Sequence, residues 1–421
     1  MTPKTLAIAL LISPILAACG GADDDPEQWS AATQPIVGGE VDDQTTGAVG
    51  LALNVLDLFF FGHCSGSLIA PNVVLTAQHC VSLTDGESPS GGVICGETDF
   101  GMTAAGAAMR VTVEPVRPEA DGPEFYKGTG QVRPAPGTDN LCGYDVALII
   151  LEGQGIGATK ATPLVPRLEG PPAIGDTYVA IGYGNTDPEG GGSGTRMRID
   201  GNTVTCTGLQ CPLGSSIAAS EWRGDAPTCS GDSGGPAIDA EGRVMGALSR
   251  GPSGCTSSIY GDVSAWKDFI IETTLEAAEL GDIDPPYWAI TGSSVPPPAA
   301  SPGEDCIGLC TEGHVCARSL GKRICVPSCD EENPSCPSGQ SCDLHAGGCV
   351  QPPPVPAVED DSGCTASPTP SSGNGSAWLA SLLALLSLRY RRRDHFISRP
   401  CRRACGRGSG PRRSLRNRVQ W

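Results

Sequence analysis

Short apolar runs separated by glycine and proline dominate residues 36–280, and long helical repeats are rare there. Examples of such runs are residues 73–75, 146–151, 178–181 and 244–248. Short runs between Gly-rich turns are typical of an all-β barrel or sandwich. Only residues 264–280 show helical spacing, with Trp266, Phe269 and Ile270 at positions i, i+3 and i+4. We therefore expect a β-rich domain over residues 36–281 that ends in a helix.

The apolar run at the N-terminus is too short to cross a bilayer. Residues 6–18 follow the basic Lys4, and an acidic segment that includes Asp23 comes soon after them. This layout favours a signal peptide over a buried strand or helix. The sequence Leu16-Ala17-Ala18-Cys19 resembles a bacterial lipobox. We predict a signal peptide over residues 1–19 with lipidation of Cys19, followed by a short propeptide over residues 20–35.

A second apolar run, residues 377–388, ends in an arginine cluster at residues 389–393. Ser362-Gly363-Cys364 and a polar spacer precede it. The layout resembles the C-terminal sorting signals of myxobacterial surface proteins, and we favour that interpretation for residues 377–393. A plain tail anchor oriented by its arginines is the alternative. Residues 394–421 are basic, show no apolar period and are expected to be a disordered tail.

Cysteines divide the remaining chain into two parts. Of the 20 cysteines, eight lie in residues 36–281 and eight in residues 304–350. Proline-rich segments, residues 282–303 and 351–376, flank the second set and are expected to be linkers. Two even sets predict four disulfides in each part, and a module of about 45 residues needs them because its core is small. So many cysteines indicate an oxidising, extracytoplasmic location at the cell surface or outer membrane.

The chain is acidic, with a formal net charge of −19 and a pI near 4.6. Twelve arginines face only one acid, Asp394, between residues 389 and 421, so the rest of the chain is more acidic still. Contact with phosphates needs clustered Lys and Arg, and therefore no nucleic-acid partner is expected for the folded parts. We expect no cofactor and no metal.

One segment carries recognisable chemistry, Thr228-Cys-Ser-Gly-Asp-Ser233-Gly-Gly-Pro. Ser233 stands between Gly-containing turns, where backbone N–H groups can converge, but a serine needs a base to act as a nucleophile. Residues 36–280 contain two histidines, and His79 follows an apolar run in Leu75-Thr-Ala-Gln-His79-Cys80. Asp145 opens the apolar run Asp145-Val-Ala-Leu and can orient the imidazole. The other histidine, His63, matches no catalytic position and is interpreted as a loop residue.

These segments together resemble the trypsin/chymotrypsin-like serine peptidases. Four motifs stand in family order: Ile36-Val-Gly-Gly, the segment ending in His79-Cys80, the segment at Asp145, and Gly-Asp-Ser233-Gly-Gly-Pro. The resemblance implies an all-β fold of two six-stranded antiparallel barrels with the triad between them. It also implies a serine endopeptidase of protein or peptide substrates, in which His79 is general base, Asp145 fixes its tautomer and Ser233 attacks.

The resemblance assigns further roles. The N–H groups of Gly231 and Ser233 would form the oxyanion hole. A new α-amino group at Ile36 would pair with Asp232 after cleavage. Because Pro35 rather than Lys or Arg precedes Ile36, we expect another protease to cut there, or a nearby cut to be used. Disulfides Cys64–Cys80 and Cys229–Cys255 are also implied, and we pair the remaining cysteines of this domain as Cys95–Cys142 and Cys206–Cys211.

Substrate specificity is expected to depart from trypsin. Pro227 stands where trypsin-type enzymes carry the aspartate that pairs with Lys or Arg, so a broad preference for small or medium apolar P1 residues is predicted. The alternative is that Asp225, two residues away, enters the pocket. The other substrate-binding residues that the resemblance implies are Thr228, Ser249, Gly251 and Ser258. Arg250 replaces the family's usual aromatic residue, which removes an apolar wall.

Two classes of function remain open from the sequence. The first is a secreted or surface-attached endopeptidase. The second is a catalytically inactive surface binding protein, in which the barrels are a scaffold and the Cys-rich module binds the ligand. That module resembles small disulfide knots of EGF-like or Dickkopf-like type, and a rigid spacer is its other interpretation. Labelling of Ser233 by a fluorophosphonate distinguishes the two classes, because only an activated serine reacts.

Overall fold

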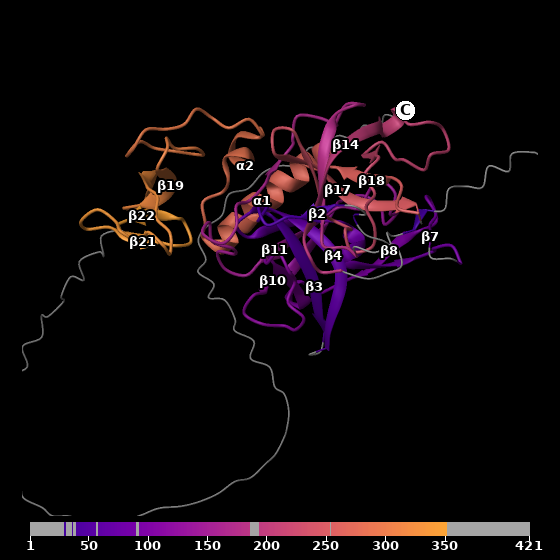
Figure 1. Ribbon diagram of the computed structural model, residues 1–421, viewed down its shortest axis with the longest axis horizontal. Coiled ribbons are helices and arrows are strands. Elements are labelled where there is room, and N and C mark those ends of the chain that lie inside the picture. The colour runs from indigo at the N-terminus through magenta and orange to yellow at the C-terminus, as the bar shows by residue number, and fades with distance from the viewer. Residues whose placement is uncertain are drawn as a thin grey trace, which may run out of the picture. The chain divides into compact units, whose positions relative to one another are not determined.

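The computed structural model describes residues 29–30, 36, 39–55, 58–89, 92–185, 193–252 and 254–351 (Figure 1). The predicted signal peptide with Cys19 lies outside these residues, as does most of the propeptide. The same holds from residue 352 on, which takes in nearly all of the second linker, the predicted sorting signal and the basic tail.

The first barrel is a closed six-stranded antiparallel sheet in the order β10-β11-β5-β4-β3-β9. Valine, leucine and isoleucine at alternate positions fill its interior, as the short apolar runs predict. The strands are β3 (Ala48–Val55), β4 (Leu58–Ala70), β5 (Val73–Thr76), β9 (Met109–Thr112), β10 (Tyr126–Pro134) and β11 (Ala147–Leu151).

The second barrel closes in the order β13-β14-β15-β18-β17-β16, because β16 also pairs with β13. Trp222 and Tyr260 stack in its interior with ring centroids 4.4 Å apart, and Tyr178 packs edge-on against both. The predicted fold class is therefore confirmed. The strands are β13 (Thr177–Gly182), β14 (Met197–Thr207), β15 (Glu221–Gly224), β16 (Pro236–Asp239), β17 (Arg243–Pro252) and β18 (Ser258–Asp262).

Several short strands and turns lie outside the two barrels. β1 (Trp29–Ser30) lies between β17 and β7 (Gly92–Val93), β2 (Glu40–Val41) pairs with β14, β12 (Val165–Pro166) pairs with β17, and β6 (Ser82–Asp85) pairs with β8 (Asp99–Thr103). Four 3-10 turns complete the set: η1 (Gln78–Cys80), η2 (Gly106–Ala108), η3 (Gly208–Gln210) and η4 (Val263–Trp266).

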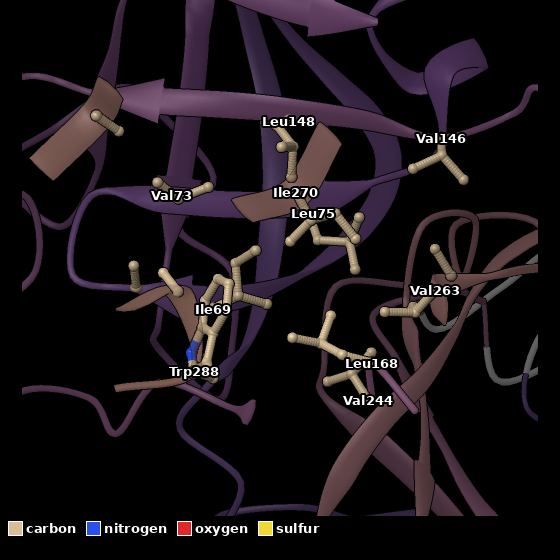
Figure 2. Close-up of a cluster of buried hydrophobic side chains, with 14 of the residues drawn as sticks. Ile69, Val73, Leu75, Val146, Leu148, Leu168, Val244, Val263, Ile270 and Trp288 are labelled. Atoms are coloured by element: carbon tan, nitrogen blue, oxygen red, sulfur yellow. The ribbon is translucent and has the colours of Figure 1, made fainter. Parts of the chain in front are cut away.

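One buried cluster joins the two barrels to the C-terminal helix (Figure 2). Leu75 and Leu148 come from the first barrel, Val244 from the second, and Ile270 from the helix α1 (Lys267–Gly281). Figure 2 shows the labelled side chains of Ile270, Leu75 and Leu148, which all belong to this cluster. Burying one such side chain contributes roughly 1.5–3 kcal/mol, so the cluster fixes the barrels against each other.

The helix α1, preceded by η4, overlaps the predicted helical segment and ends one residue beyond it. The predicted linker 282–303 is more ordered than its prolines suggest. It contains the helix α2 (Tyr287–Thr291), whose Trp288 is buried in the barrel cluster. The Ser294 hydroxyl donates to Pro166 O at 2.6 Å and accepts from Leu168 N. Within the described ranges, no helix is long and apolar enough to cross a membrane.

The Cys-rich module consists of two hairpins, β19 (His314–Ser319) with β20 (Lys322–Pro327), and β21 (Ser341–Asp343) with β22 (Gly348–Val350). Two disulfides bracket each hairpin, so the connectivity pairs each cysteine with the next but one within its group of four. The disulfides are Cys306–Cys316, Cys310–Cys325, Cys329–Cys342 and Cys336–Cys349.

Candidate active site

Two neighbouring strands bring His79 and Asp145 together. β5 and β11 run antiparallel, with Thr76 opposite Ala147. The chain that leaves β5 and the chain that enters β11 therefore meet at one end of the barrel. His79 lies in the turn η1 that follows β5, and Asp145 lies two residues before β11.

The His79 and Asp145 side chains form a close, buried pair. Asp145 Oδ2 lies 2.7 Å from His79 Nδ1, and Asp145 Oδ1 accepts from the His79 backbone N–H at 2.9 Å. Burial alone would raise the pKa of Asp145, but the charge and the hydrogen bonds of His79, together with that of Ser249, lower it. An ionised carboxylate only accepts, so Nδ1 must carry the proton. The Nε2 lone pair of His79 is then free to accept a proton.

Burial also lowers the pKa of His79, but the charge and the hydrogen bond of Asp145 outweigh it. The net effect leaves the pKa of His79 above its ordinary value. A third group completes the arrangement, because the Ser249 hydroxyl donates to Asp145 Oδ2 at 2.6 Å. Asp145 thus takes part in three hydrogen bonds while it is 2% exposed.

The segment around Ser233 is fixed by strand β4 of the other barrel. The Ser65 N–H donates to Ser233 O at 2.8 Å, and the Ser65 hydroxyl donates to Gly231 O at 2.7 Å. Gly231 has a φ of 97° and Gly234 a φ of 79°, values that glycine adopts without strain. A Cβ at Gly234 would also lie 2.0 Å from Thr76 Oγ1. Among the described hydrogen bonds, none joins the Ser233 hydroxyl to His79.

Asp232 lies buried directly before Ser233. Its carboxylate accepts from the N–H groups of Cys229 and Gly184, both at 2.9 Å, and from that of Ile36. Because the chain is continuous before Ile36, this residue offers a peptide N–H and no ammonium. Burial without a cation raises the pKa of Asp232 to about 7, although the three hydrogen bonds act against that rise.

Two of the residues expected to line the specificity pocket, Thr228 and Ser258, carry hydroxyls and no charge. The Thr228 and Ser258 hydroxyls lie 2.6 Å apart, and Ser258 also donates to Ala226 O at 2.5 Å. Both side chains are buried, whereas Pro227 is half-buried. Asp225 is exposed, and its carboxylate accepts from the N–H and the hydroxyl of Thr203 at 2.6 and 2.7 Å. Asp225 is therefore held at the surface of the barrel by strand β14.

The edge of β17 beyond Ser249 accepts an extended segment. Ser30 pairs with Gly251 and Trp29 with Pro252, in antiparallel register. On its other side the same segment pairs with Gly92 and Val93 of β7. An edge strand presents a row of free peptide groups, which an extended peptide can satisfy.

Disulfides support the loops near the site. The structure joins Cys64 to Cys80 next to His79, and Cys229 to Cys255 behind the Ser233 segment. Cys95 is joined to Cys142, three residues before Asp145, and Cys206 to Cys211. These are the four pairs expected from the sequence for the barrels.

Sequence reasoning missed Glu221, a single acid that belongs to no motif. The sequence suggested only that Arg250 removes an apolar wall. In the structure the Arg250 side chain is buried and forms a bidentate ion pair with Glu221. The only sequence signal was that an arginine stands inside an otherwise apolar strand, which requires an acidic partner.

Comparison with known proteins bears on this site. The family model described as Trypsin matches residues 36–270. The chain belongs to the trypsin family. Its relatives include a trypsin of Saccharopolyspora erythraea, 29% identical over 223 residues, which covers 50% of this chain and 86% of that protein. Trypsin-1 of Astacus astacus is 26% identical, and kallikrein-2 of Homo sapiens is 28% identical. These alignments cover 50% and 51% of this chain, and 88% and 80% of the two proteins.

Membership in the trypsin family makes the barrels a serine-peptidase domain with protein or peptide substrates. The match ends at residue 270, before the Cys-rich module begins. Family membership therefore concerns the barrels, and the module stands outside it.

Proposed function

We propose that this chain is an extracytoplasmic serine endopeptidase whose triad is His79, Asp145 and Ser233. The observation that supports this most is the buried His79–Asp145 pair, with Nδ1 protonated and Nε2 free to act as a base. Ser233 belongs to a segment that β4 ties to the same barrel end through Ser65. All three residues of the proposed triad are present in family order.

In the first half of the reaction, His79 Nε2 takes the proton of the Ser233 hydroxyl as Oγ attacks the substrate carbonyl. The tetrahedral oxyanion is stabilised by the N–H groups of Gly231 and Ser233. Asp145 stabilises the imidazolium that forms and stays ionised. His79 then gives the proton to the leaving amine, and the acyl-enzyme remains.

In the second half, water replaces the amine. His79 removes a proton from the water, whose oxygen attacks the acyl carbon. Collapse of the second tetrahedral intermediate returns the proton to Ser233 and releases the acid product. The hydrogen bonds on Asp145 keep the imidazole in one orientation through both halves, which makes the proton transfers short.

Activation rests on Asp232. A buried carboxylate whose pKa is raised to about 7 lacks a cation. Cleavage before Ile36 would supply an ammonium at the place where the Ile36 N–H already lies. The same cut would detach the segment with Trp29 and Ser30, whose backbone occupies the β17 edge next to Ser249. Cleavage would therefore clear the edge that we propose for the substrate backbone, and would separate the enzyme from any lipid on Cys19.

The proposed pocket favours small or medium apolar P1 residues. The Thr228 hydroxyl donates to Ser258, whose own proton goes to Ala226 O, and neither side chain offers a charge to a Lys or Arg side chain. Burying an unpaired cation there would cost several kcal/mol. The alternative donor of charge, Asp225, is bound to Thr203 at the surface. Profiling a P1 library with the enzyme that begins at Ile36 tests this, and a dominance of Arg or Lys would contradict it.

An extracytoplasmic location follows from the chemistry of the cysteines. Every one of the sixteen cysteines within residues 64–349 is in a disulfide. Such bonds form and persist in oxidising compartments. Attachment through Cys19 or through residues 377–393 is part of the same proposal, and mass spectrometry of the mature termini in membrane fractions tests it.

A fluorophosphonate probe tests the proposed activity itself. The Ile36-started enzyme should be labelled at Ser233, and Ser233→Ala should not be labelled. His79→Ala should lose labelling while it keeps its fold, which shows that the base activates the serine. An enzyme that is unlabelled after cleavage at Ile36 would favour the scaffold function in place of catalysis.

A further inference from the structure

Arg250 and Glu221 form an ion pair that is 1% exposed on both sides. Arg250 Nη1 donates to Glu221 Oε1 at 2.6 Å, and Nη2 donates to Glu221 Oε2 at 2.9 Å. This is the two-pronged geometry that only a guanidinium provides. Charges are costly to bury unless further hydrogen bonds satisfy them. What else the pair contacts therefore indicates its role.

The guanidinium reaches the proposed triad through one hydroxyl. Arg250 Nη1 also donates to Ser249 Oγ at 3.1 Å, and Ser249 Oγ donates to Asp145 Oδ2 at 2.6 Å. A guanidinium has no acceptor, so the Ser249 oxygen must accept from it. The single hydroxyl proton of Ser249 is then directed to Asp145. Arg250 thereby fixes the direction of this hydrogen bond.

Glu221 holds the backbone that leads to Asp145. Its Oε1 accepts from the N–H of Gly143 at 2.7 Å, two residues before Asp145, and its Oε2 accepts from the N–H of Ala218 at 2.8 Å. Gly143 has a φ of 90°, and a Cβ there would lie 2.8 Å from the Cβ of Ala218. Arg250 Nη2 donates to Ser216 O at 2.7 Å on the same loop. The ion pair thus connects β17, β15 and two loops beside the triad.

We propose that Arg250, held by Glu221, is a positioning residue that acts through Ser249 to orient Asp145 and the His79 imidazole. The proposal rests on the peptidase function proposed above and adds residues that belong to none of its catalytic motifs. Arg250 touches no reacting atom in it. Its contribution is to keep the hydroxyl of Ser249 pointing at Asp145 through both halves of the reaction.

The charge of Arg250 gives the proposal a second, measurable consequence. The charged groups that act on His79 are Asp145 and Glu87, which favour the imidazolium, and Arg250, which disfavours it. Removing the guanidinium should therefore raise the pKa of His79. The acid limb of the profile of kcat/KM against pH would then move to higher pH, because His79 must be neutral to act as the base.

The main experiment uses Arg250→Met together with Glu221→Gln, which removes both charges without leaving one buried alone. We expect kcat to fall about 10-fold, the scale of one hydrogen bond to a charged group, and the acid limb to move up. Arg250→Lys keeps the positive charge but loses the bidentate hydrogen bonds of the guanidinium. The acid limb of the kcat/KM profile should therefore stay at the same pH while kcat falls. Arg250→Met/Glu221→Gln and Ser249→Ala should be non-additive in kcat, since the ion pair acts through Ser249.

A matched control lies on the same strand. Arg243, at the start of β17, forms an ion pair with Asp239, with 2.8 Å between Arg243 Nη2 and Asp239 Oδ2. Arg243→Met with Asp239→Asn should lower thermal stability but leave the kcat and the acid limb unchanged. If the Arg250 double variant behaves like this control, the pair is only structural and the proposal is wrong.

An NMR titration of the His79 imidazole separates this proposal from the proposed peptidase function. The resonance is assigned by its loss in His79→Ala. A raised pKa of His79 in Arg250→Met/Glu221→Gln would support the positioning role even in a protein that no fluorophosphonate labels. An unchanged pKa together with an unchanged kcat would overturn it in a protein that is active.

Discussion

The barrels and the Cys-rich module differ in what stabilises them. Buried clusters of aliphatic and aromatic side chains fill both barrels and the space between them. None of the described clusters contains a residue of the module, whose most buried side chains are mainly cysteines such as Cys349 and Cys325. A small domain cannot bury enough apolar surface, so cross-links limit the freedom of its unfolded chain instead. Packing therefore fixes the barrels, whereas disulfides hold the module together.

The largest expected effect is the loss of kcat when a proposed catalytic residue of the barrels is replaced while the module is left unchanged. Ser233→Ala or His79→Ala should reduce kcat by a factor on the order of 10⁶, because the two residues act as a unit. The melting temperature should stay close to that of the parent enzyme. Hydrolysis of a peptide substrate by the Ile36-started enzyme measures this. Near-normal turnover by Ser233→Ala would show that the proposed triad is wrong.

Asp145→Asn should reduce kcat by roughly 10⁴. The amide would donate to Nδ1 and leave the proton on Nε2, so His79 could not act as the base. The chain offers a matched control in Asp225→Asn, because Asp225 is exposed and bound to Thr203. Asp225→Asn should keep both kcat and the P1 preference, as stopped-flow and peptide-library measurements can show.

Cross-link removal should affect the two regions differently. Cys336→Ser with Cys349→Ser should destabilise the module by about 2–4 kcal/mol, enough to unfold a domain without a large core. Limited proteolysis should then cut within residues 304–350, while kcat is kept. Cys206→Ser with Cys211→Ser in the barrel, a pair only 5 residues apart in sequence, should leave the fold intact because the aromatic core remains. Loss of peptidase activity in the module variant would show that the two regions are coupled.

The smallest expected effect is a pH dependence of stability in the uncut chain. Burial raises the pKa of Asp232 to about 7, whereas the pKa of an aspartate in the unfolded chain is about 3.9. The folded state then binds a proton more tightly than the unfolded state, so stability falls as pH rises between these values. In the enzyme cut before Ile36 the ammonium should remove this loss. Melting curves of Ser233→Ala, uncut and cut, at pH 5 and pH 8 test the difference, and parallel changes in both forms would contradict it.

The sequence predicted the fold because its evidence was local. Barrel strands such as β5 and β11 are short and apolar, and four motifs carry the family pattern at Ile36, His79, Asp145 and Ser233. The fold class is confirmed, and the trypsin family is shown for the barrels. The roles of the site residues stay proposals, although the structure places His79 and Asp145 in contact as their motifs suggest. The sequence did not predict the short helix in residues 282–303, because the prolines there indicated a linker. Only the structure shows that Trp288 of this segment is buried.

The sequence by itself determined the candidate chemistry, since a nucleophile, a base and an acid each stand in a motif whose residues are neighbours along the chain. Only the tertiary structure decided the surroundings of that chemistry. The pairing of Arg250 with Glu221 joins residues 29 positions apart on strands β17 and β15, and neither residue lies in a motif that names the other. The outward placement of Asp225 depends in the same way on Thr203 of strand β14. Such partners are set by which strands close a barrel, and that closure is decided by packing across the whole domain.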